Sequence, residues 1–394
     1  MPKYVCEHDY TRESFSQQLP PANMVPPPLP DHSFAVYVSG NTGVPPSLDF
    51  YETHLLHRPR SERFRTIHAD SPPSFDATGD FMNLSRLYED ALLAGPERPC
   101  LIVDEDVLTY RQLHKTTLAN ARALQCLGVC PGDRVAFHMG NRLDIAPLCF
   151  GCFYIGAVAA PLRCCDTAPE LARAISDCGA KILVIGKEQL HTLPAVREQS
   201  SGLEQCFVIG GDPAGKVPSW EEQTLGGACD PPPPHVSADN DPAVVIDSPT
   251  GADVPNSATH SAHSLACRAR DYAATLKLAG DTRFLTAATL CHGAHLAGLL
   301  LPIALCGGAV ICSRNQEPHA MHWLMRRWRP TYANLPPGLL RAMLDAPGFD
   351  PALYAGLTAL YVDGDKIPPD LDSDYAAKTG GQLRKAADMS KCGG

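Results

Sequence analysis

The sequence of 394 residues contains no long uncharged apolar run, so no segment of it predicts a membrane span. The amino terminus, residues 1–9, also lacks the apolar stretch of a signal peptide, and we therefore expect a cytoplasmic protein. A basic excess is missing as well: the formal net charge is −10. The short basic run at 326–329 is typical of one solvated helix face. These absences argue against nucleic-acid and membrane partners.

Two enzyme signatures are also absent. The sequence has no Gly-x-Ser-x-Gly elbow, which disfavours an α/β-hydrolase, and no complete Walker loop. Its sixteen cysteines are scattered through apolar segments, which indicates reduced, buried side chains. Cys149 and Cys152 form a CxxC pair, but no second pair has matching spacing. We therefore predict no zinc or redox site.

The sequence does contain enough apolar material for a large core, since 44% of its residues are hydrophobic and 19% are charged. Residues 1–75 are rich in proline and poorly periodic, and we interpret them as an N-terminal extension. From residue 82 onward helical and strand patterns alternate, and the proline run 231–234 forms a stiff connector. This organisation predicts a first α/β subdomain at 76–235 and a second at 236–394.

Short apolar runs separated by helical patterns predict an α/β fold of layered, mostly parallel sheets with flanking helices. One helix carries Leu118, Ala121 and Leu124 on one side and stops at Gly128, and another is predicted over 168–178. The predicted strands cover residues 135–137, 181–185, 206–209, 243–246, 284–287, 309–312, 331–335 and 359–362.

The segment from Asp241 to Leu265 says most about function. It reads as an apolar strand, a small-residue loop containing Gly251, and the start of a helix. In that layout backbone N–H groups and hydroxyls can cradle a phosphate. The lysine expected in such a loop is missing, because Asn256 stands in its place, and Asp253 adds a negative charge. The context indicates a nucleotide enzyme, and the residues indicate one that is damaged or repurposed.

Further motifs follow one another in a recognisable order. Residues 108–113 read Leu-Thr-Tyr-x-x-Leu, 128–136 read Gly-Val-x-x-Gly-Asp-x-Val-Ala, and 156–162 read Gly-Ala-Val-x-x-Pro-Leu. The remaining segments are Asn141, 241–243, 281–285 with His292 and 307–310, 336–337, 364–371 and 387–391. From about Asn83 onward this order resembles the adenylate-forming superfamily of acyl- and aryl-CoA synthetases, peptide-synthetase adenylation domains and luciferases.

The resemblance implies a fold like the N-terminal domain of these enzymes. It also implies a parent reaction in which a small carboxylic acid and ATP, usually with Mg²⁺, give an acyl-adenylate and pyrophosphate. The phosphate-binding residues that it implies are Ser248, Thr250, Gly251, Ser390 and Lys391. The implied adenine-binding residues are Gly364, Asp365, Ala387 and Asp388, and the implied acyl pocket is lined by His292, His295 and Pro336.

Three departures from the family pattern bear on activity. The family's loop, Thr-Ser-Gly-Thr-Thr-Gly-x-Pro-Lys-Gly, is replaced at 248–257 by a version in which Pro249 removes a backbone donor and Asp253 repels triphosphate. Lys391 stands where the family has a metal-binding Glu; it cannot hold Mg²⁺ but can contact a phosphate. The sequence stops three residues later, and we expect it to lack the β-barrel and the lid with its catalytic Lys.

Adenylation depends on electrostatic stabilisation of the transferring phosphate, and three expected sources of it are missing. The sequence therefore assigns no catalytic residue and leaves three hypotheses open. The chain is an AMP-dependent carboxylic-acid ligase relative with impaired activity, or an incomplete gene product. Alternatively, it is a non-catalytic pseudoenzyme that binds an acyl ligand or serves as a scaffold for a partner synthetase or carrier protein.

His292 and His295 have two interpretations of their own. As members of the family's acyl pocket they would face the bound acid. As an i, i+3 pair at a helix start they would be satisfied by backbone groups. A metal site would need a third ligand, and none is evident in the sequence.

Overall fold

The computed structural model describes residues 84–163, 167–200, 202–226, 232–247, 257–363 and 366–386. The chain divides into two units, Met1–Arg65 and Thr66–Gly394, and every described residue belongs to the second. The predicted extension at 1–75 therefore lies outside the described residues. The predicted subdomain boundary at 235/236 stays a prediction.

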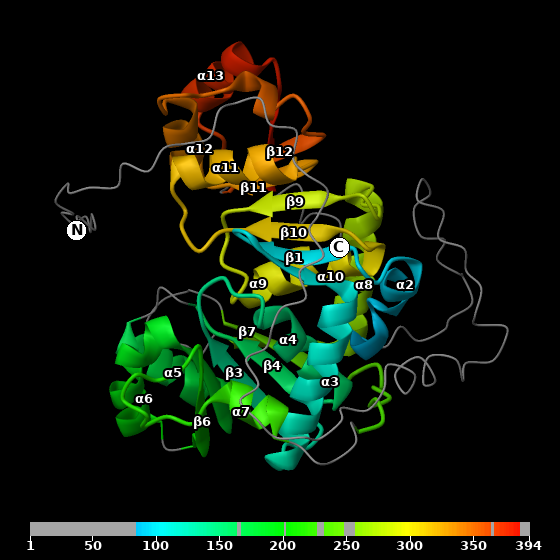
Figure 1. Ribbon diagram of the computed structural model, residues 1–394, viewed down its shortest axis with the longest axis vertical. Helices are drawn as coiled ribbons and strands as arrows, with labels where there is room; N and C mark the ends of the chain where they lie inside the picture. The colour runs from blue at the N-terminus through cyan, green and yellow to red at the C-terminus, as the bar shows by residue number, and fades with distance from the viewer. Residues whose placement is uncertain are drawn as a thin grey trace, which may run out of the picture. The chain divides into compact units, whose positions relative to one another are not determined.

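Seven strands among the described residues form one sheet, in the order β13-β12-β11-β9-β10-β1-β2 (Figure 1). All neighbours in it run parallel except β1 and β2, which are antiparallel. The strands are β1 (Pro99–Val103), β2 (Asp106–Thr109), β9 (Arg283–Thr286), β10 (Ala309–Cys312), β11 (Tyr332–Leu335), β12 (Ala359–Val362) and β13 (Leu383–Lys385).

A second sheet of six described strands has the order β6-β5-β3-β4-β7-β8, parallel apart from the edge strand β8. Its strands are β3 (Arg134–His138), β4 (Val158–Pro161), β5 (Ile182–Gly186), β6 (Gln205–Ile209), β7 (Pro242–Asp247) and β8 (Ser257–Ser261). The two sheets confirm the predicted α/β class. The sequence placed a helix start directly after the loop at 248–256, and this was wrong, since β8 comes first.

Local sequence signals set the helix boundaries. At the start of α3, the N–H of Gln112 donates to Thr109 Oγ1 at 3.2 Å, and the N–H of Thr109 donates to Gln112 Oε1 at 2.9 Å. Helix α5 has the bounds that the sequence predicts and ends at Gly179, which adopts the left-handed conformation with φ of 61°. Such signals act over a few residues, which is why these bounds could be predicted.

The α-helices are α2 (Glu89–Ala94), α3 (Tyr110–Cys126), α4 (Ile145–Tyr154), α5 (Ala168–Cys178), α6 (Leu193–Gln199), α7 (Trp220–Leu225), α8 (Ala262–Leu276), α9 (Gly293–His295), α10 (Leu301–Cys306), α11 (Pro318–Trp328), α12 (Pro337–Leu344) and α13 (Pro369–Thr379). The 3₁₀ turns are η2 (Leu84–Arg86), η3 (Lys187–Thr192) and η5 (Pro351–Leu353), and a π-helical turn, η4, covers Leu296–Leu300. No helix in the described ranges combines the length and apolar character needed to cross a membrane.

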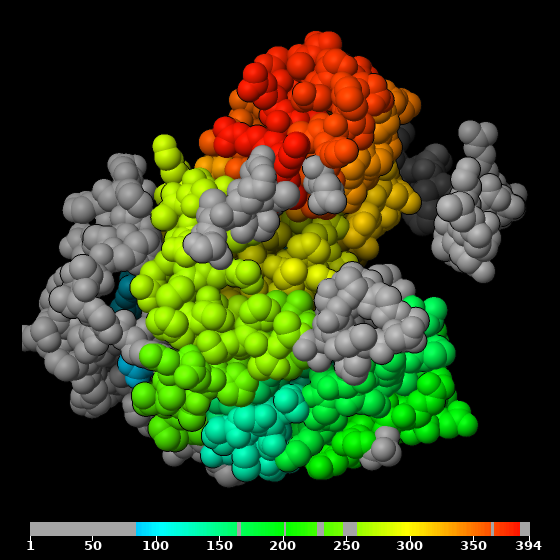
Figure 2. Space-filling model, turned by 180° about the vertical axis from the view of Figure 1, so that it is seen from behind, coloured from blue at the N-terminus to red at the C-terminus, as the bar shows by residue number. Residues whose placement is uncertain are grey.

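The two faces of the seven-stranded sheet pack against different helices. On one face, Ala333 and Leu335 of β11 join a buried core with side chains of α11, α12 and α13. On the other face, Tyr332 stacks on Phe284, and its hydroxyl donates to the carbonyl of Leu276 in α8 at 2.7 Å. Helix α8 lies within the yellow-green residues at the centre of the surface in Figure 2.

Candidate functional site

The residues that the sequence assigns to the nucleotide lie outside the described residues. They are Ser248, Thr250, Gly251, Gly364, Asp365, Ala387, Asp388, Ser390 and Lys391. The strands that precede them are described, however. β7 ends at Asp247, β12 at Val362 and β13 at Lys385, and all three run parallel within their sheets. Ligands in open α/β sheets bind at the carboxyl ends of the strands, so this edge is the candidate site.

The segment after β9 brings His292 to the end of β7. Gly293 follows His292 and begins α9. A Cβ added at Gly293 would lie 2.5 Å from Ile246 Cγ1 and 3.2 Å from Ile246 Cα, so only a glycine allows this approach. The structure therefore places the predicted acyl-pocket segment against the strand that leads into the predicted phosphate loop.

The two histidines differ in their partners. Their rings lie 5.0 Å apart between centroids. Nδ1 of His295 lies 3.0 Å from the carbonyl of Thr289 and donates to it, because a carbonyl can only accept. Nδ1 of His292 is buried, and no described residue forms a hydrogen bond with it. The interpretation as a backbone-satisfied pair thus fits His295 and not His292.

Both imidazoles are held in the neutral form. Burial lowers the pKa of His292 to about 4, helped by the neighbouring His295 and by Arg163. Burial also lowers the pKa of His295, although its bond to Thr289 and the negative charge of Asp363 act in the opposite direction. At neutral pH these rings can exchange hydrogen bonds with a ligand without adding charge.

Pro336 begins the connection after β11. It is the N-cap residue of α12, and its carbonyl accepts a hydrogen bond from the N–H of Leu340 at 3.0 Å. The proline itself offers no donor, so its contribution to a pocket is a fixed backbone path at the carboxyl end of β11.

The sequence reasoning missed a polar pair beside it. Asn334 is only 3% exposed, and its Nδ2 donates to Asp363 Oδ1 at 2.9 Å. Strand alternation places Asn334 on the same face of the sheet as Tyr332, opposite the core of α11 to α13. The one available signal was a polar residue inside the apolar run Tyr-Ala-Asn-Leu at 332–335.

Asn141 joins the two sheets at this edge. Its Nδ2 donates to the carbonyls of Ala288 at 3.2 Å and Ser313 at 2.9 Å, and its Oδ1 accepts from the N–H of Leu290 at 2.9 Å. Cys291 adds a contact between its Sγ and the carbonyl of Phe137 at 3.1 Å. The position of His292 therefore depends on the end of β3 as well as on β9.

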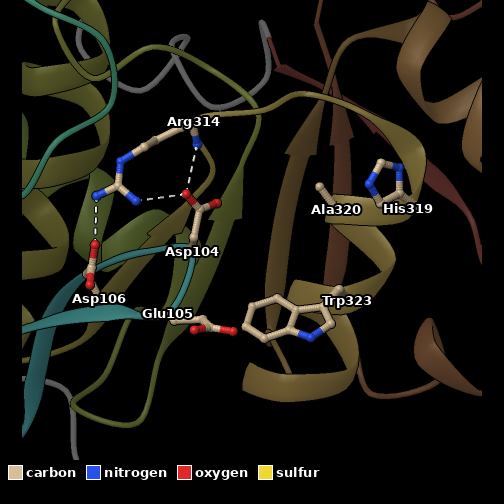
Figure 3. Close-up of a pocket in the computed structure, with 7 residues that line it drawn as sticks. All are labelled: Asp104, Glu105, Asp106, Arg314, His319, Ala320 and Trp323. Atoms are coloured by element: carbon tan, nitrogen blue, oxygen red, sulfur yellow. Dashed lines mark hydrogen bonds and ion pairs between the residues drawn. The ribbon is translucent and has the colours of Figure 1, made fainter. Parts of the chain in front are cut away.

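A separate open hollow of about 400 Å³ lies beside the turn between β1 and β2 (Figure 3). Arg314 spans one side of it, donating to Asp104 at 3.1 Å and to Asp106 at 2.7 Å. Trp323 of α11 forms another wall, and the carboxylate of Glu105 points toward its ring in Figure 3. Three carboxylates outnumber one guanidinium among the lining residues, so this hollow is unsuited to a triphosphate.

Comparison with known proteins relates the chain to a family of enzymes. The family model described as "AMP-binding enzyme" matches residues 88–388. The chain is 29% identical over 268 residues to a feruloyl-CoA synthase of Amycolatopsis sp., with 68% of this chain and 51% of that protein covered. It is 26% identical over 294 residues to the long-chain-fatty-acid–CoA ligase FadD13 of Mycobacterium tuberculosis, with 73% of this chain and 56% of that ligase covered.

A solved structure shows the same fold. The N-terminal domain of FACL13 from Mycobacterium tuberculosis superposes with a TM-score of 0.68 at 22% sequence identity, covering 76% of this chain and 74% of that domain. The chain thus spans about half the length of the two enzymes that it matches in sequence.

Proposed function

Because the chain belongs to the AMP-binding enzyme family, we propose that it binds ATP and a small carboxylic acid at the carboxyl edge of its two sheets. The observation that carries this proposal is the contact of Gly293 with Ile246. It brings the segment of His292 against the strand that leads into the phosphate loop. An acid bound beside His292 would then lie next to a nucleotide bound by that loop, as acyl-adenylate formation requires.

The proposed division of roles follows the strands. The loop after β7 would bind the phosphates through Ser248, Thr250 and Gly251, assisted by Ser390 and Lys391 after β13. The proposed adenine contacts are Gly364, Asp365, Ala387 and Asp388. The acid would bind beside His292, His295 and Pro336, where the neutral imidazoles can accept or donate hydrogen bonds.

The residues assigned to the phosphates do not fit a Mg²⁺ ion. Lys391 stands where the family has its metal-binding Glu, and an ammonium group supplies no oxygen ligand. In the part of the chain that the structure describes, no cluster of three His, Cys, Asp or Glu side chains could hold a metal ion. We therefore assign the neutralisation of phosphate charge to Lys391 itself and derive no step through a metal.

We propose that adenylation by this chain is strongly impaired. Asn256 replaces the loop lysine, and Asp253 brings negative charge toward the triphosphate. The alternative is a non-catalytic protein that keeps the acid site and acts on a partner synthetase or carrier protein. The close packing of α9 on β7 supports retention of the acid site under both alternatives.

Pyrophosphate exchange in the presence of carboxylic acids tests the proposal. The chain should show little exchange, and Asn256→Lys combined with Lys391→Glu should raise it in the presence of Mg²⁺. A protein that exchanges at the rate of an ordinary ligase would contradict the impairment. If ATP and every acid tested fail to bind, the ligand-binding function itself is wrong.

A further inference from the structure

We propose that the acid bound at this site carries a hydrogen-bond donor, a hydroxyl or an amino group, on the part that meets Asn334. This inference rests on the proposed function, because it names the class of acid that the site takes. It arises from one atom, the side-chain oxygen of Asn334, which is buried and has no hydrogen-bond partner among the described residues.

The hydrogen bond to Asp363 fixes the orientation of the Asn334 amide. Nδ2 lies 2.9 Å from Asp363 Oδ1. An ionised carboxylate only accepts hydrogen bonds, so the amide nitrogen must face it, and turning the amide over would set two acceptors against each other. Oδ1 therefore faces away from Asp363.

No described residue supplies the donor that Oδ1 lacks. The register partner on β9 is Thr286; its hydroxyl accepts from the N–H of Ala288 at 3.0 Å and makes no hydrogen bond with Asn334. On the other side, Asn334 pairs with Tyr361 of β12 through the backbone ladder. Folded proteins leave few buried polar atoms unpaired, because an unmet acceptor pays its full desolvation cost. A ligand bound at this edge is the partner that we assign to this oxygen.

The position of Oδ1 points to the ligand rather than to the core. Ala333 and Leu335, on either side along β11, belong to the apolar core with α11 to α13. Asn334 lies on the opposite face, one residue before the carboxyl end of its strand. Asp363 follows β12 at the same edge and is near enough to His295 to act on its pKa. This is the edge to which the acid is assigned.

The local charge selects among possible groups. A hydrocarbon or methyl-ether end offers no donor and would leave Asn334 Oδ1 unmet beside a carboxylate. A hydroxyl can donate to Oδ1, and an amino group can donate to Oδ1 and to Asp363 together. Acids that carry a hydroxyl and acids that carry an amino group share a hydrogen-bond donor. A second carboxylate on the acid would be repelled by Asp363.

Calorimetric titration of the full chain with matched aryl acids tests this. The probes are benzoic and cinnamic acids whose para position carries hydrogen, methoxy, hydroxyl or amino. We expect the para-hydroxy or para-amino compound to bind about tenfold to a hundredfold more tightly than the unsubstituted and para-methoxy compounds of the same length. Stronger binding of the para-amino compound than of the para-hydroxy compound would identify Asp363 as a second acceptor.

The variant Asp363→Asn gives the sharpest change. The new amide can donate to Asn334 Oδ1, which frees the Asn334 amide to turn and present Nδ2 to the ligand. The preference should then move from the hydroxyl acid toward the methoxy acid, which accepts. The variant Asn334→Leu, of similar volume, should abolish the preference, so that acids of one length bind with the same affinity whatever their para group.

Asn120 provides a matched control. It is also buried, at 6% exposed, with Nδ2 donating to the Thr116 carbonyl at 2.7 Å and Oδ1 accepting from Trp220 Nε1 at 2.8 Å. Asn120→Leu should cost stability and keep the ligand preference. The preference is a ratio of dissociation constants measured on one protein, so a general loss of folded protein does not move it.

The outcomes separate this inference from the proposed function. Binding of ATP, together with equal affinity for the four acids of each length, would overturn the donor requirement, as expected if a water molecule alone satisfies Asn334. That result would leave the proposed function standing. Binding of ATP with no acid bound would overturn the inference and the acid site together. No binding of ATP or any acid would overturn both proposals.

Discussion

The side-chain oxygen of Asn141 accepts a hydrogen bond from the backbone N–H of Leu290 at 2.9 Å. The two residues are 149 positions apart in the sequence, one after β3 and the other after β9. The bond therefore connects the carboxyl edges of both sheets two residues before His292. The geometry of the proposed acid site therefore depends on a residue outside the set that we assign to the acid.

Replacing Asn141 should affect both stability and binding. Asn141→Ala leaves the Leu290 N–H and two carbonyls without their partner, so the free energy of unfolding should fall by about 3 kcal/mol. Urea denaturation measures this loss. Asn120→Ala, at a similarly buried site on α3, should lose stability but keep acid affinity. Equal acid affinity in the two folded variants would contradict a positioning role for Asn141.

The contact of α9 with β7 can be tested by adding one methyl group. In Gly293→Ala the new Cβ would overlap Ile246, which must displace α9 or β7 at a cost of about 1–3 kcal/mol. ATP and acid binding should weaken together. Gly298→Ala is the control, because among the described residues its Cβ would meet the ring end of Tyr272, at 3.7 Å from Oη and 3.9 Å from Cζ, which are ordinary contacts. If both variants bind ligands like the parent, α9 does not couple the two subsites.

Much of the fold could be predicted from the sequence. Helix α5 and strands such as β5 follow from periodic or continuous apolar residues, which are local properties. Strand β8 was missed because Ser257 to Ser261 has little apolar character, and it becomes a strand through its antiparallel ladder with β7.

Less of the candidate site could be predicted from local sequence patterns. The sequence pointed to His292 and His295 but could not tell that only His295 has a backbone partner. The pairing of Asn334 with Asp363 depends on the register between β11 and β12, which no local pattern specifies.

The lowered histidine pKa values predict a pH-dependent stability. Burial lowers the pKa of His114, His138 and His292 to about 4, so the unfolded chain binds more protons than the folded chain between roughly pH 6.5 and 4. These histidines make their full contribution to the free energy of unfolding above that window. The free energy of unfolding falls as the pH drops through the window, by at most about 1.4 kcal/mol per pH unit for each such group. Denaturant unfolding at pH 7, 6 and 5 measures the slope.

Carboxyl groups act in a lower window. The pKa of Asp133 is lowered by its hydrogen bond with Lys181, and its contribution is lost only as the pH falls below about 4. His138→Gln should reduce the slope between pH 7 and 5, because it removes an imidazole whose pKa is lowered to about 4 by burial. An unchanged slope in His138→Gln would refute the role assigned to burial of that imidazole.

Titration of the purified chain with ATP, with and without Mg²⁺, shows directly whether the proposed nucleotide site exists. We expect measurable binding that does not require Mg²⁺, because the proposed phosphate contact of Lys391 supplies the positive charge, and we expect weaker binding in Gly293→Ala. No heat of binding at millimolar ATP, in a sample shown to be folded and monodisperse, would contradict a nucleotide site at the carboxyl edge of these sheets.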